Sequence, residues 1–348
     1  MAAMSASPAV RPEAYPILPS AKPWAAHDLK IAVLVPCMNE EVAIERVVAG
    51  FRAALPTATV YVYDNNSTDG TIEAARRAGA VVGAERLQGK GNVVRRMFSD
   101  VDADIYVLVD GDDTYDAAAS PAMVAKLLDE QLDMVNGARK TESVGAYRPG
   151  HRFGNALLTG MVALIFGDRF QDLLSGYRIF SRRYVKSFPA LSAGFEIETE
   201  LTVHALELRM PVAEVDTVYK DRPAGSASKL RTYRDGVRIL RTIVNLMKGE
   251  RPLLFFSIAF ALLAILSLAL AYPIFVTYER TGLVPRFPTA ILSSATMLLA
   301  FLCLFAGLIL DTVTHGRREL KRLRYLEIPA PPRTVEAQWP AAEEPSSS

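Results

Sequence analysis

The chain has 348 residues, enough for one large domain or two modest ones, and half of its residues are hydrophobic. Its 39 Lys and Arg balance 38 Asp and Glu, so net charge indicates no partner of either sign, and we expect no nucleic-acid partner. The two cysteines, Cys37 and Cys303, suggest no disulfide framework and favour a reducing, cytosolic setting. Residues 1–29 are rich in Ala, Pro and Ser without a signal-peptide core, which predicts a flexible arm.

Strand-like and helix-like stretches alternate from residue 30 to about residue 139. Strands are expected within 30–37, 58–64, 80–84, 105–109 and 133–139, and helices within 40–55, 71–80, 90–101 and 117–132. This alternation predicts an α/β fold with a mostly parallel sheet flanked by helices on both faces. Ligands in such sheets bind beyond the carboxyl ends of the strands, so the polar residues after Val35, Tyr63 and Val109 should meet in one crevice.

The buried strand 105–109 is followed by four carboxylates within seven residues, Asp110, Asp112, Asp113 and Asp116. Like charges so close together repel, so the cluster must either be well solvated or hold a cation. An Asp-x-Asp pair at the mouth of a parallel sheet can bind Mg²⁺ or Mn²⁺ through oxygen, and the ion can then bridge a substrate diphosphate. A solvated acidic loop is the alternative.

Two apolar stretches without any charge, 252–278 and 287–310, occupy the C-terminal part. Each exceeds the roughly 20 residues that cross a bilayer as a helix, although two buried core helices are an alternative. Basic residues flank the outer ends, which predicts a membrane hairpin with both termini and the preceding α/β domain on the cytoplasmic side of the cell (inner) membrane. The remainder, 311–348, is predicted to be a basic and then disordered cytoplasmic tail.

Residues 231–251 join the two parts. On a helix, Arg234, Arg238, Arg241 and Lys248 share one stripe opposite an apolar one. This pattern predicts a juxtamembrane amphipathic helix in the membrane interface, its basic face toward anionic headgroups. A soluble helix that packs on the preceding domain is the alternative, and the two are compatible.

Four motifs occur in a diagnostic order: Pro36-x-x-Asn39-Glu40, Asp64 with Ser67-x-Asp69-Gly70-Thr71, Gly89-Lys90-Gly91, and Asp110-x-Asp112. Together they resemble the inverting family 2 glycosyltransferases of GT-A fold. Later stretches, among them "RFGN", "DLLSGYRIFSRR" and "YKDRPAGSASKL", resemble the dolichyl-phosphate mannosyltransferase-like, polyprenyl-phosphate branch. The resemblance covers 30–230, the predicted GT-A catalytic domain.

The resemblance implies site residues by position. Pro36, Asn39, Glu40 and Asp64 would contact the donor nucleoside, Lys90 its phosphates, Asp110 and Asp112 the nucleotide and a metal ion, Arg139 and Arg152 the lipid phosphate, and Arg222, Ser226 and Lys229 would close over the donor. Many relatives carry Gln two residues after the Asp-x-Asp, where this chain has Thr114. The third ligand of the Mg²⁺ or Mn²⁺ ion therefore stays open among Asp113, Thr114 and water.

Asp172, ahead of "SGYR", is a candidate general base or orienting residue. A phosphate monoester has a second pKa near 6, so a lipid phosphate is mostly dianionic at neutral pH and requires alignment more than deprotonation. Glu196, Glu198 and Glu200 alternate with other residues and fit either a solvated face or sugar contacts.

The implied reaction is attack of a polyprenyl or dolichyl phosphate oxygen on the sugar C1 of a UDP- or GDP-linked donor, with inversion. A processive polysaccharide synthase is disfavoured, because its Gln-x-x-Arg-Trp motif has no counterpart and the only tryptophans are Trp24 and Trp339. A sugar nucleotidyltransferase would need a Gly-rich loop after the first strand, where "PCMNEE" stands. A non-catalytic membrane scaffold or flippase subunit is the other alternative, and a homo-oligomer is possible.

Overall fold

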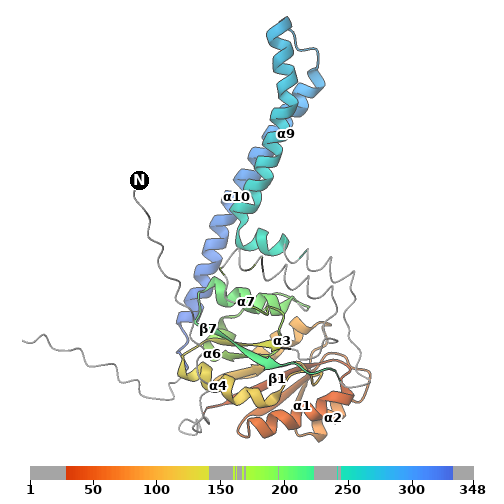
Figure 1. Ribbon diagram of the computed structural model, residues 1–348, viewed down its shortest axis with the longest axis vertical. Helices are drawn as coiled ribbons and strands as arrows, with labels where there is room; N and C mark the ends of the chain where they lie inside the picture. The colour runs from red at the N-terminus through yellow and green to blue at the C-terminus, as the bar shows by residue number, and fades with distance from the viewer. Residues whose placement is uncertain are drawn as a thin grey trace, which may run out of the picture.

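The computed structural model describes residues 29–140, 160, 162, 167, 170–194, 196–222, 241 and 244–331. Three predicted site residues, Arg152, Ser226 and Lys229, lie outside these ranges, as do the N-terminal arm and most of the predicted interfacial helix. Figure 1 shows an α/β domain from which a long helical hairpin projects.

Within the described ranges the domain is built on one seven-stranded sheet with the order β3-β2-β1-β4-β6-β5-β7. The strands are β1 (Ile31–Cys37), β2 (Thr59–Asp64), β3 (Val81–Ala84), β4 (Ile105–Leu108), β5 (Met134–Lys140), β6 (Arg178–Ser181) and β7 (Val212–Val218). Strands β1 to β4 pair in parallel, as do β5 and β7, whereas β6 runs antiparallel to both β4 and β5. The predicted α/β fold with a mostly parallel sheet is confirmed, and β6 and β7 are two additional strands that the sequence analysis did not predict.

Helices cover both faces of this sheet. They are α1 (Glu41–Ala54), α2 (Thr71–Arg77), α3 (Lys90–Asp100), the 3-10 turn η1 (Ala117–Ala119), α4 (Ser120–Asp129), α6 (Arg182–Ser187) and α7 (Ile197–Glu207). Successive residues of β1 alternate between two separate apolar cores, with Val33 and Val35 beneath α1 and Leu34 on the side of α3 and α7. Burial on both faces explains why the strands read as nearly continuous apolar runs.

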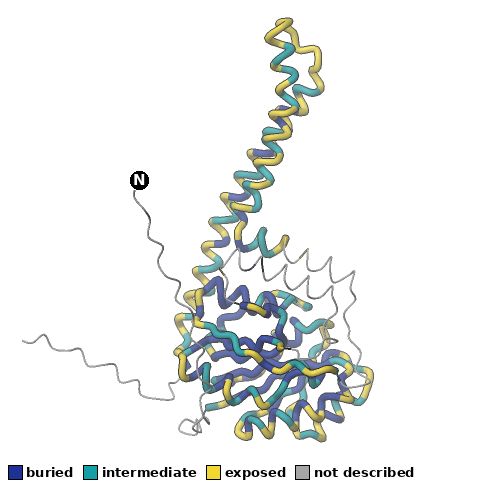
Figure 2. Tube along the Cα trace, in the orientation of Figure 1, coloured by how far each residue is buried: buried dark blue, intermediate teal, exposed yellow. Residues whose placement is uncertain are grey.

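The hairpin consists of α9 (Pro252–Thr281) and α10 (Phe287–Leu326). Both are long and apolar enough to cross a membrane, with mean hydropathies of 2.8 and 2.2 over their most apolar windows. Few of their residues are buried (Figure 2), which argues against two buried core helices. Helix α10 continues as one helix beyond Leu310, the predicted end of the apolar segment, to Leu326 at the side of the α/β domain (Figure 1).

Small side chains hold the hairpin together. The buried residues of α10 recur every seven positions, at Ser293, Ala300, Gly307 and Thr314. Small residues at this interval let two helices pack closely along a coiled-coil seam. Ser267 of α9 and Ser293 exchange hydrogen bonds with each other's carbonyl oxygens at 2.8 and 3.0 Å, which satisfies both hydroxyls away from water.

Candidate functional site

The loops after β1 and β2 lock together at the carboxyl edge of the sheet. Cys37 and Asp64 are register partners at the ends of these strands. The side-chain oxygen of Asn39 accepts a hydrogen bond from the Thr68 backbone amide at 2.8 Å. The Asn39 backbone amide donates to the Ser67 hydroxyl, also at 2.8 Å. The polar stretch from Ser67 onward therefore fixes the loop that carries Asn39.

Pro36 and Glu40 flank this loop. Pro36 lies in β1 opposite Tyr63 of β2. Glu40 is buried at the start of α1, and its amide donates to the Thr71 hydroxyl at 2.9 Å. Both residues are held by the same pair of interlocked loops as Asn39.

Asp64 carries a buried oxygen for which the described ranges supply no hydrogen-bond donor. Its Oδ2 accepts the Ser67 amide at 3.0 Å, whereas the buried Oδ1 has no hydrogen-bond partner among the described residues. A buried carboxylate oxygen without a donor is costly, so this atom is suited to a donor group on a ligand.

The turn before α3 is fastened by Asn65. Its side-chain amide donates to the carbonyls of Glu85 and Leu87 at 2.9 and 2.8 Å, and its Oδ1 accepts the Gly89 amide at 2.7 Å. This arrangement delivers Lys90 to the first position of α3.

The two glycines around Lys90 are required by a close backbone approach. A Cβ on Gly89 would lie 2.2 Å from the Ala193 carbonyl oxygen, and one on Gly91 would lie 2.1 Å from that of Ser192. The segment ahead of α7 therefore packs directly on the Gly-Lys-Gly turn, which brings α7 to Lys90.

Lys90 is buried between two carboxylates. Its Nζ lies 2.5 Å from Asp110 Oδ1 and 2.6 Å from Glu198 Oε1 of α7. Burial alone lowers the pKa of Lys90, but the two carboxylates outweigh it and hold the pKa above its ordinary value, so the ammonium stays charged. Of the three glutamates left open from the sequence, Glu198 thus belongs to the site.

Asp112 is paired with Arg222. The Arg222 guanidinium lies 2.6 Å from Asp112 Oδ2, and the Thr114 hydroxyl donates to Oδ1 at 2.6 Å. Burial, followed by the charge of Asp110, raises the pKa of Asp112, and Arg222 acts in the opposite direction. The repulsion expected in this acidic cluster is therefore balanced within the described chain by Lys90 and Arg222.

Asp113 pairs with a cation of α1. Its backbone has a positive φ of 59°, and its carboxylate lies 2.8 Å from Arg46 of α1. A role for Asp113 as metal ligand stays a prediction, and it would require exchange of the Arg46 contact.

The acids at the end of β4 fit a divalent ion that shares its ligands with a substrate. Among the described residues no group of three or more His, Cys, Asp or Glu side chains is arranged to hold a metal ion. Mg²⁺ commonly takes one or two carboxylates and completes its shell with substrate phosphates and water. Asp110 and Asp112 supply that carboxylate pair.

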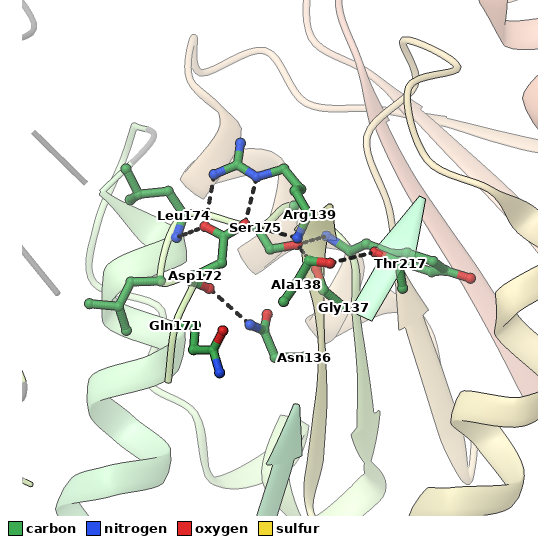
Figure 3. A network of polar contacts seen from close by, with 12 residues as sticks. Asn136, Gly137, Ala138, Arg139, Gln171, Asp172, Leu174, Ser175 and Thr217 are labelled. Atoms are coloured by element: carbon green, nitrogen blue, oxygen red, sulfur yellow. Dashed lines mark hydrogen bonds and ion pairs between the residues drawn. The ribbon is translucent and has the colours of Figure 1, made fainter. Parts of the chain in front are cut away.

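Asp172 and Arg139 form a bidentate ion pair (Figure 3). Arg139 Nε donates to Oδ2 at 2.7 Å and its terminal nitrogen to Oδ1 at 2.8 Å, while the Leu174 amide also donates to Oδ1. Burial raises the pKa of Asp172, but the hydrogen bonds and charge of Arg139 outweigh it, so the pKa lies below its ordinary value. A carboxylate so engaged is a poor proton acceptor, which favours the orienting role.

The segment that follows Asp172 brings this pair next to the acids. The Gly176 amide donates to the Tyr115 hydroxyl at 2.8 Å, and a Cβ on Gly176 would lie 2.2 Å from Asp110 Oδ2. The guanidinium of Arg139 lies 5.5 Å from the centre of the Tyr219 ring, which packs edge-on against Tyr115. The Arg139–Asp172 pair and the Asp110–Lys90 pair thus lie on two sides of one site.

Arg178 supports this segment, and the sequence did not identify it as a residue of the site. Its fully buried guanidinium donates to the carbonyls of Leu173 and Ser175 at 2.7 and 3.1 Å and to the Thr202 hydroxyl at 2.8 Å. Burial lowers the pKa of Arg178 from its ordinary value. The only signal in the sequence was a single arginine at the edge of the apolar stretch in "SGYRIF".

Comparison with known proteins agrees with this geometry. Residues 32–188 match the family described as Glycosyl transferase family 2. The glycosyltransferase AglJ of Haloferax volcanii is 34% identical over 302 residues, which cover 85% of this chain and 98% of AglJ. A dolichyl-phosphate hexose transferase of the same organism is 28% identical over 221 residues, 64% of this chain and 95% of that protein.

A solved structure shares the fold. Glucosyl-3-phosphoglycerate synthase from Mycobacterium tuberculosis, in complex with Mn²⁺, UDP and glucosyl-3-phosphoglycerate, superposes with a TM-score of 0.53 at 23% identity, covering 63% of this chain and 79% of that one. This likeness concerns the fold alone. With the family match and the near full-length similarity to AglJ, it follows that the chain belongs to glycosyl transferase family 2.

Proposed function

We propose that this enzyme transfers a sugar from a UDP- or GDP-linked donor to a polyprenyl or dolichyl phosphate at the cytoplasmic face of the membrane, with inversion at the anomeric carbon. The observation that carries the proposal is the close approach of Gly176 to Asp110, which sets the Arg139–Asp172 pair beside the acid pair. A cationic group suited to an acceptor phosphate then faces a site suited to a donor diphosphate, on a domain joined to a hairpin of membrane-spanning length.

On the donor side, Asp64 Oδ1, which has no hydrogen-bond partner in the described part of the chain, accepts a ring N–H of the nucleobase, a group that both uracil and guanine offer. Pro36, Asn39 and Glu40 line the nucleoside. Lys90 and Arg222 turn to the phosphates, and Ser226 and Lys229 close over them.

Asp110 and Asp112 would hold Mg²⁺ or Mn²⁺, an ion that, when bound, supplies stabilisation of the charge developing on the departing diphosphate. The M. tuberculosis structural relative was crystallised with Mn²⁺ and UDP, which supports divalent metal use.

On the acceptor side, Arg139, together with Arg152, binds the lipid phosphate and offsets its repulsion from the donor diphosphate. A phosphate oxygen forms the new bond to C1 while the bond from C1 to the diphosphate oxygen breaks. The dianion needs no proton removed, so Asp172 stays ionised and fixes the direction of the Arg139 fork. The similarity to a dolichyl-phosphate hexose transferase supports this class of acceptor.

The test is direct transfer in a membrane. Full-length protein in liposomes is incubated with polyprenyl phosphate and radiolabelled UDP- and GDP-sugars, with and without Mn²⁺. We expect lipid-linked label with one donor, only with the metal, and none with Asp112→Asn. The matched control is Asp102→Asn, because Asp102 is exposed and pairs with Arg182 away from the site. Donor binding without any transfer to lipid would refute the proposal and favour a non-catalytic scaffold.

A further inference from the structure

The C-terminal third of α10, beyond Leu310, is rich in basic residues and lies against the catalytic domain. From the sequence these residues were interpreted only as the basic flank that places this end of the membrane hairpin on the cytoplasmic side. In the structure several of them instead meet carboxylates of the chain itself, and these contacts form what we call the α10 clamp: Asp133, Arg183, Glu207, Glu250, Arg317, Arg318, Lys321 and Tyr325.

Glu207, the last residue of α7, is the first anchor of the clamp. Its side chain is fully inaccessible to solvent, and Lys321 Nζ lies 2.6 Å from its Oε2. Arg318 Nε lies 3.4 Å from its Oε1. A carboxylate at this depth depends on these cations, because a buried charge without a partner is strongly destabilising.

Asp133, directly before β5, is the second anchor. It is fully buried and accepts the Tyr325 hydroxyl at 2.7 Å together with two nitrogens of Arg183 at 2.5 and 2.8 Å. The Arg183 guanidinium also lies 4.8 Å from the centre of the Tyr325 ring. Tyr325 is therefore held both at its hydroxyl and on its face.

Glu250 ties the other helix of the hairpin into the same network. It lies two residues before α9, and its two carboxylate oxygens lie 3.1 Å from Arg317 and Arg318 respectively. Arg318 thus contacts both Glu207 of the catalytic domain and Glu250 at the base of α9.

The anchors sit on the elements that carry the site. Helix α7 has Glu198 beside Lys90 near one end and Glu207 at the other. Strand β5 begins directly after Asp133 and contains Arg139, the partner of Asp172. Helix α7 joins Glu207 to Glu198, and strand β5 joins Asp133 to Arg139, in each case without an intervening loop. A change in the orientation of α10 should therefore shift the site residues as well.

We propose that the α10 clamp is a positioning device that holds the Arg139 side of the site at a fixed height and tilt above the bilayer, so that a membrane-embedded lipid phosphate can reach it. At 1.5 Å per residue, Lys321 lies about 16 Å along the helix from Leu310, the end of the uncharged segment. The positioning role rests on the proposed lipid acceptor, whereas the contacts that form the clamp are independent of it. Glu207 and Asp133 act through α10 and are positioning residues, not catalytic ones.

The test compares two acceptors. The variants are Lys321→Ala and the conservative Tyr325→Phe, singly and together. The control is Arg324→Ala, because Arg324 pairs with Glu327 and both side chains are exposed. We expect the double variant to transfer sugar to long-chain polyprenyl phosphate in liposomes at least tenfold more slowly. With a short, water-soluble prenyl phosphate in detergent the change should stay below twofold. Equal losses with both acceptors would overturn the positioning role.

Vesicle composition separates the clamp from headgroup binding. The defect should be the same in neutral phosphatidylcholine vesicles and in vesicles that contain phosphatidylglycerol. A defect confined to the anionic vesicles, or one shared by Arg324→Ala, would show that the basic residues act on headgroups and would overturn the inference.

A distance measurement tests the clamp without any activity. Spin labels at Arg76 of α2 and Thr312 of α10, both exposed, are introduced with Cys303 replaced by alanine. The distance distribution should be narrow in the parent and broad in the double variant, and an unchanged distribution would refute the clamp. If the parent transfers no sugar to either acceptor, the proposed function fails, while this measurement still decides on the clamp.

Discussion

Replacement of Glu198 by glutamine tests how Lys90 is paired within the proposed donor site. Glu198→Gln keeps the size of the side chain and an acceptor oxygen for Lys90 but removes one negative charge. In the parent, Lys90 retains Glu198 as a partner when Asp110 binds a divalent ion. In the variant, the same exchange leaves a buried ammonium facing a neutral amide, so binding of metal and nucleotide should weaken.

The magnitude follows from burial and distance. The Lys90 and Glu198 side chains are 8% and 11% exposed and 2.6 Å apart, so water screens the pair weakly. A hydrogen bond to a charged partner contributes about 1.5–3 kcal/mol, which corresponds to roughly 10- to 150-fold in affinity. We expect a loss in that range for UDP or GDP measured with Mn²⁺ present.

Isothermal titration calorimetry checks this prediction on the purified full-length protein. The control is Glu130→Gln, because Glu130 forms a Lys–Glu pair of the same 2.6 Å length with Lys126 on an exposed helix surface. Unchanged affinity in Glu198→Gln would refute the reasoning. So would an equal loss without Mn²⁺, because Lys90 would then act on the nucleotide independently of the exchange at Asp110.

Three further outcomes follow from the structure. Asp112→Asn should lower the rate of sugar transfer by at least about 100-fold in the labelled-product assay without loss of expression, since it removes one of the two acids suited to the ion. Activity within tenfold of the parent would exclude Asp112 from the metal site. Burial lowers the pKa of His204 from 6.5 to about 3, so below pH 6.5 the unfolded chain takes up a proton that the folded chain refuses. Stability should therefore fall as pH falls, by about 2 kcal/mol at pH 5 from this group, and His204→Leu should show a smaller drop in apparent melting temperature between pH 7.5 and 5. Gly307→Leu should lower the melting temperature in detergent through overpacking of about 1–3 kcal/mol, because a Cβ there lies 2.9 Å from Phe256 Cβ, whereas the half-exposed Leu308→Ala should not.

The sequence predicted the part of the fold that depends on local pattern. Apolar runs buried on both faces, alternating with amphipathic helices, specify a parallel sheet, and the rule for strand ends then brings Asn39, Asp64 and Asp110 to one edge. Strand β6 escaped because its four residues begin with Arg178, and no local pattern marks a buried arginine as part of a strand. It forms only because β4 and β5 lie on either side of it.

The pairing of charges within the site could not be predicted from local pattern. Lys90 read as a phosphate partner, whereas the structure also sets it against Glu198, which is 108 residues away. That contact depends on α7 lying over the Gly-Lys-Gly turn, a packing that no spacing in the sequence records. The basic residues of α10 were likewise interpreted by their place next to an apolar segment, although Lys321 finds its partner, Glu207, 114 residues away.

The charge balance of the site constrains how the proposed donor binds. Three carboxylates, Asp110, Asp112 and Glu198, meet two cations, Lys90 and Arg222, so the group carries a formal charge of −1, from −3 and +2. A donor diphosphate with two negative charges would alone take it to about −3, and a divalent ion alone to about +1; both changes are costly in a buried site. Together they leave the net charge unchanged. Donor and ion should therefore bind as a unit. Arg222 can then exchange Asp112 for the phosphates, and Lys90 can exchange Asp110 for them while it keeps Glu198 as a partner.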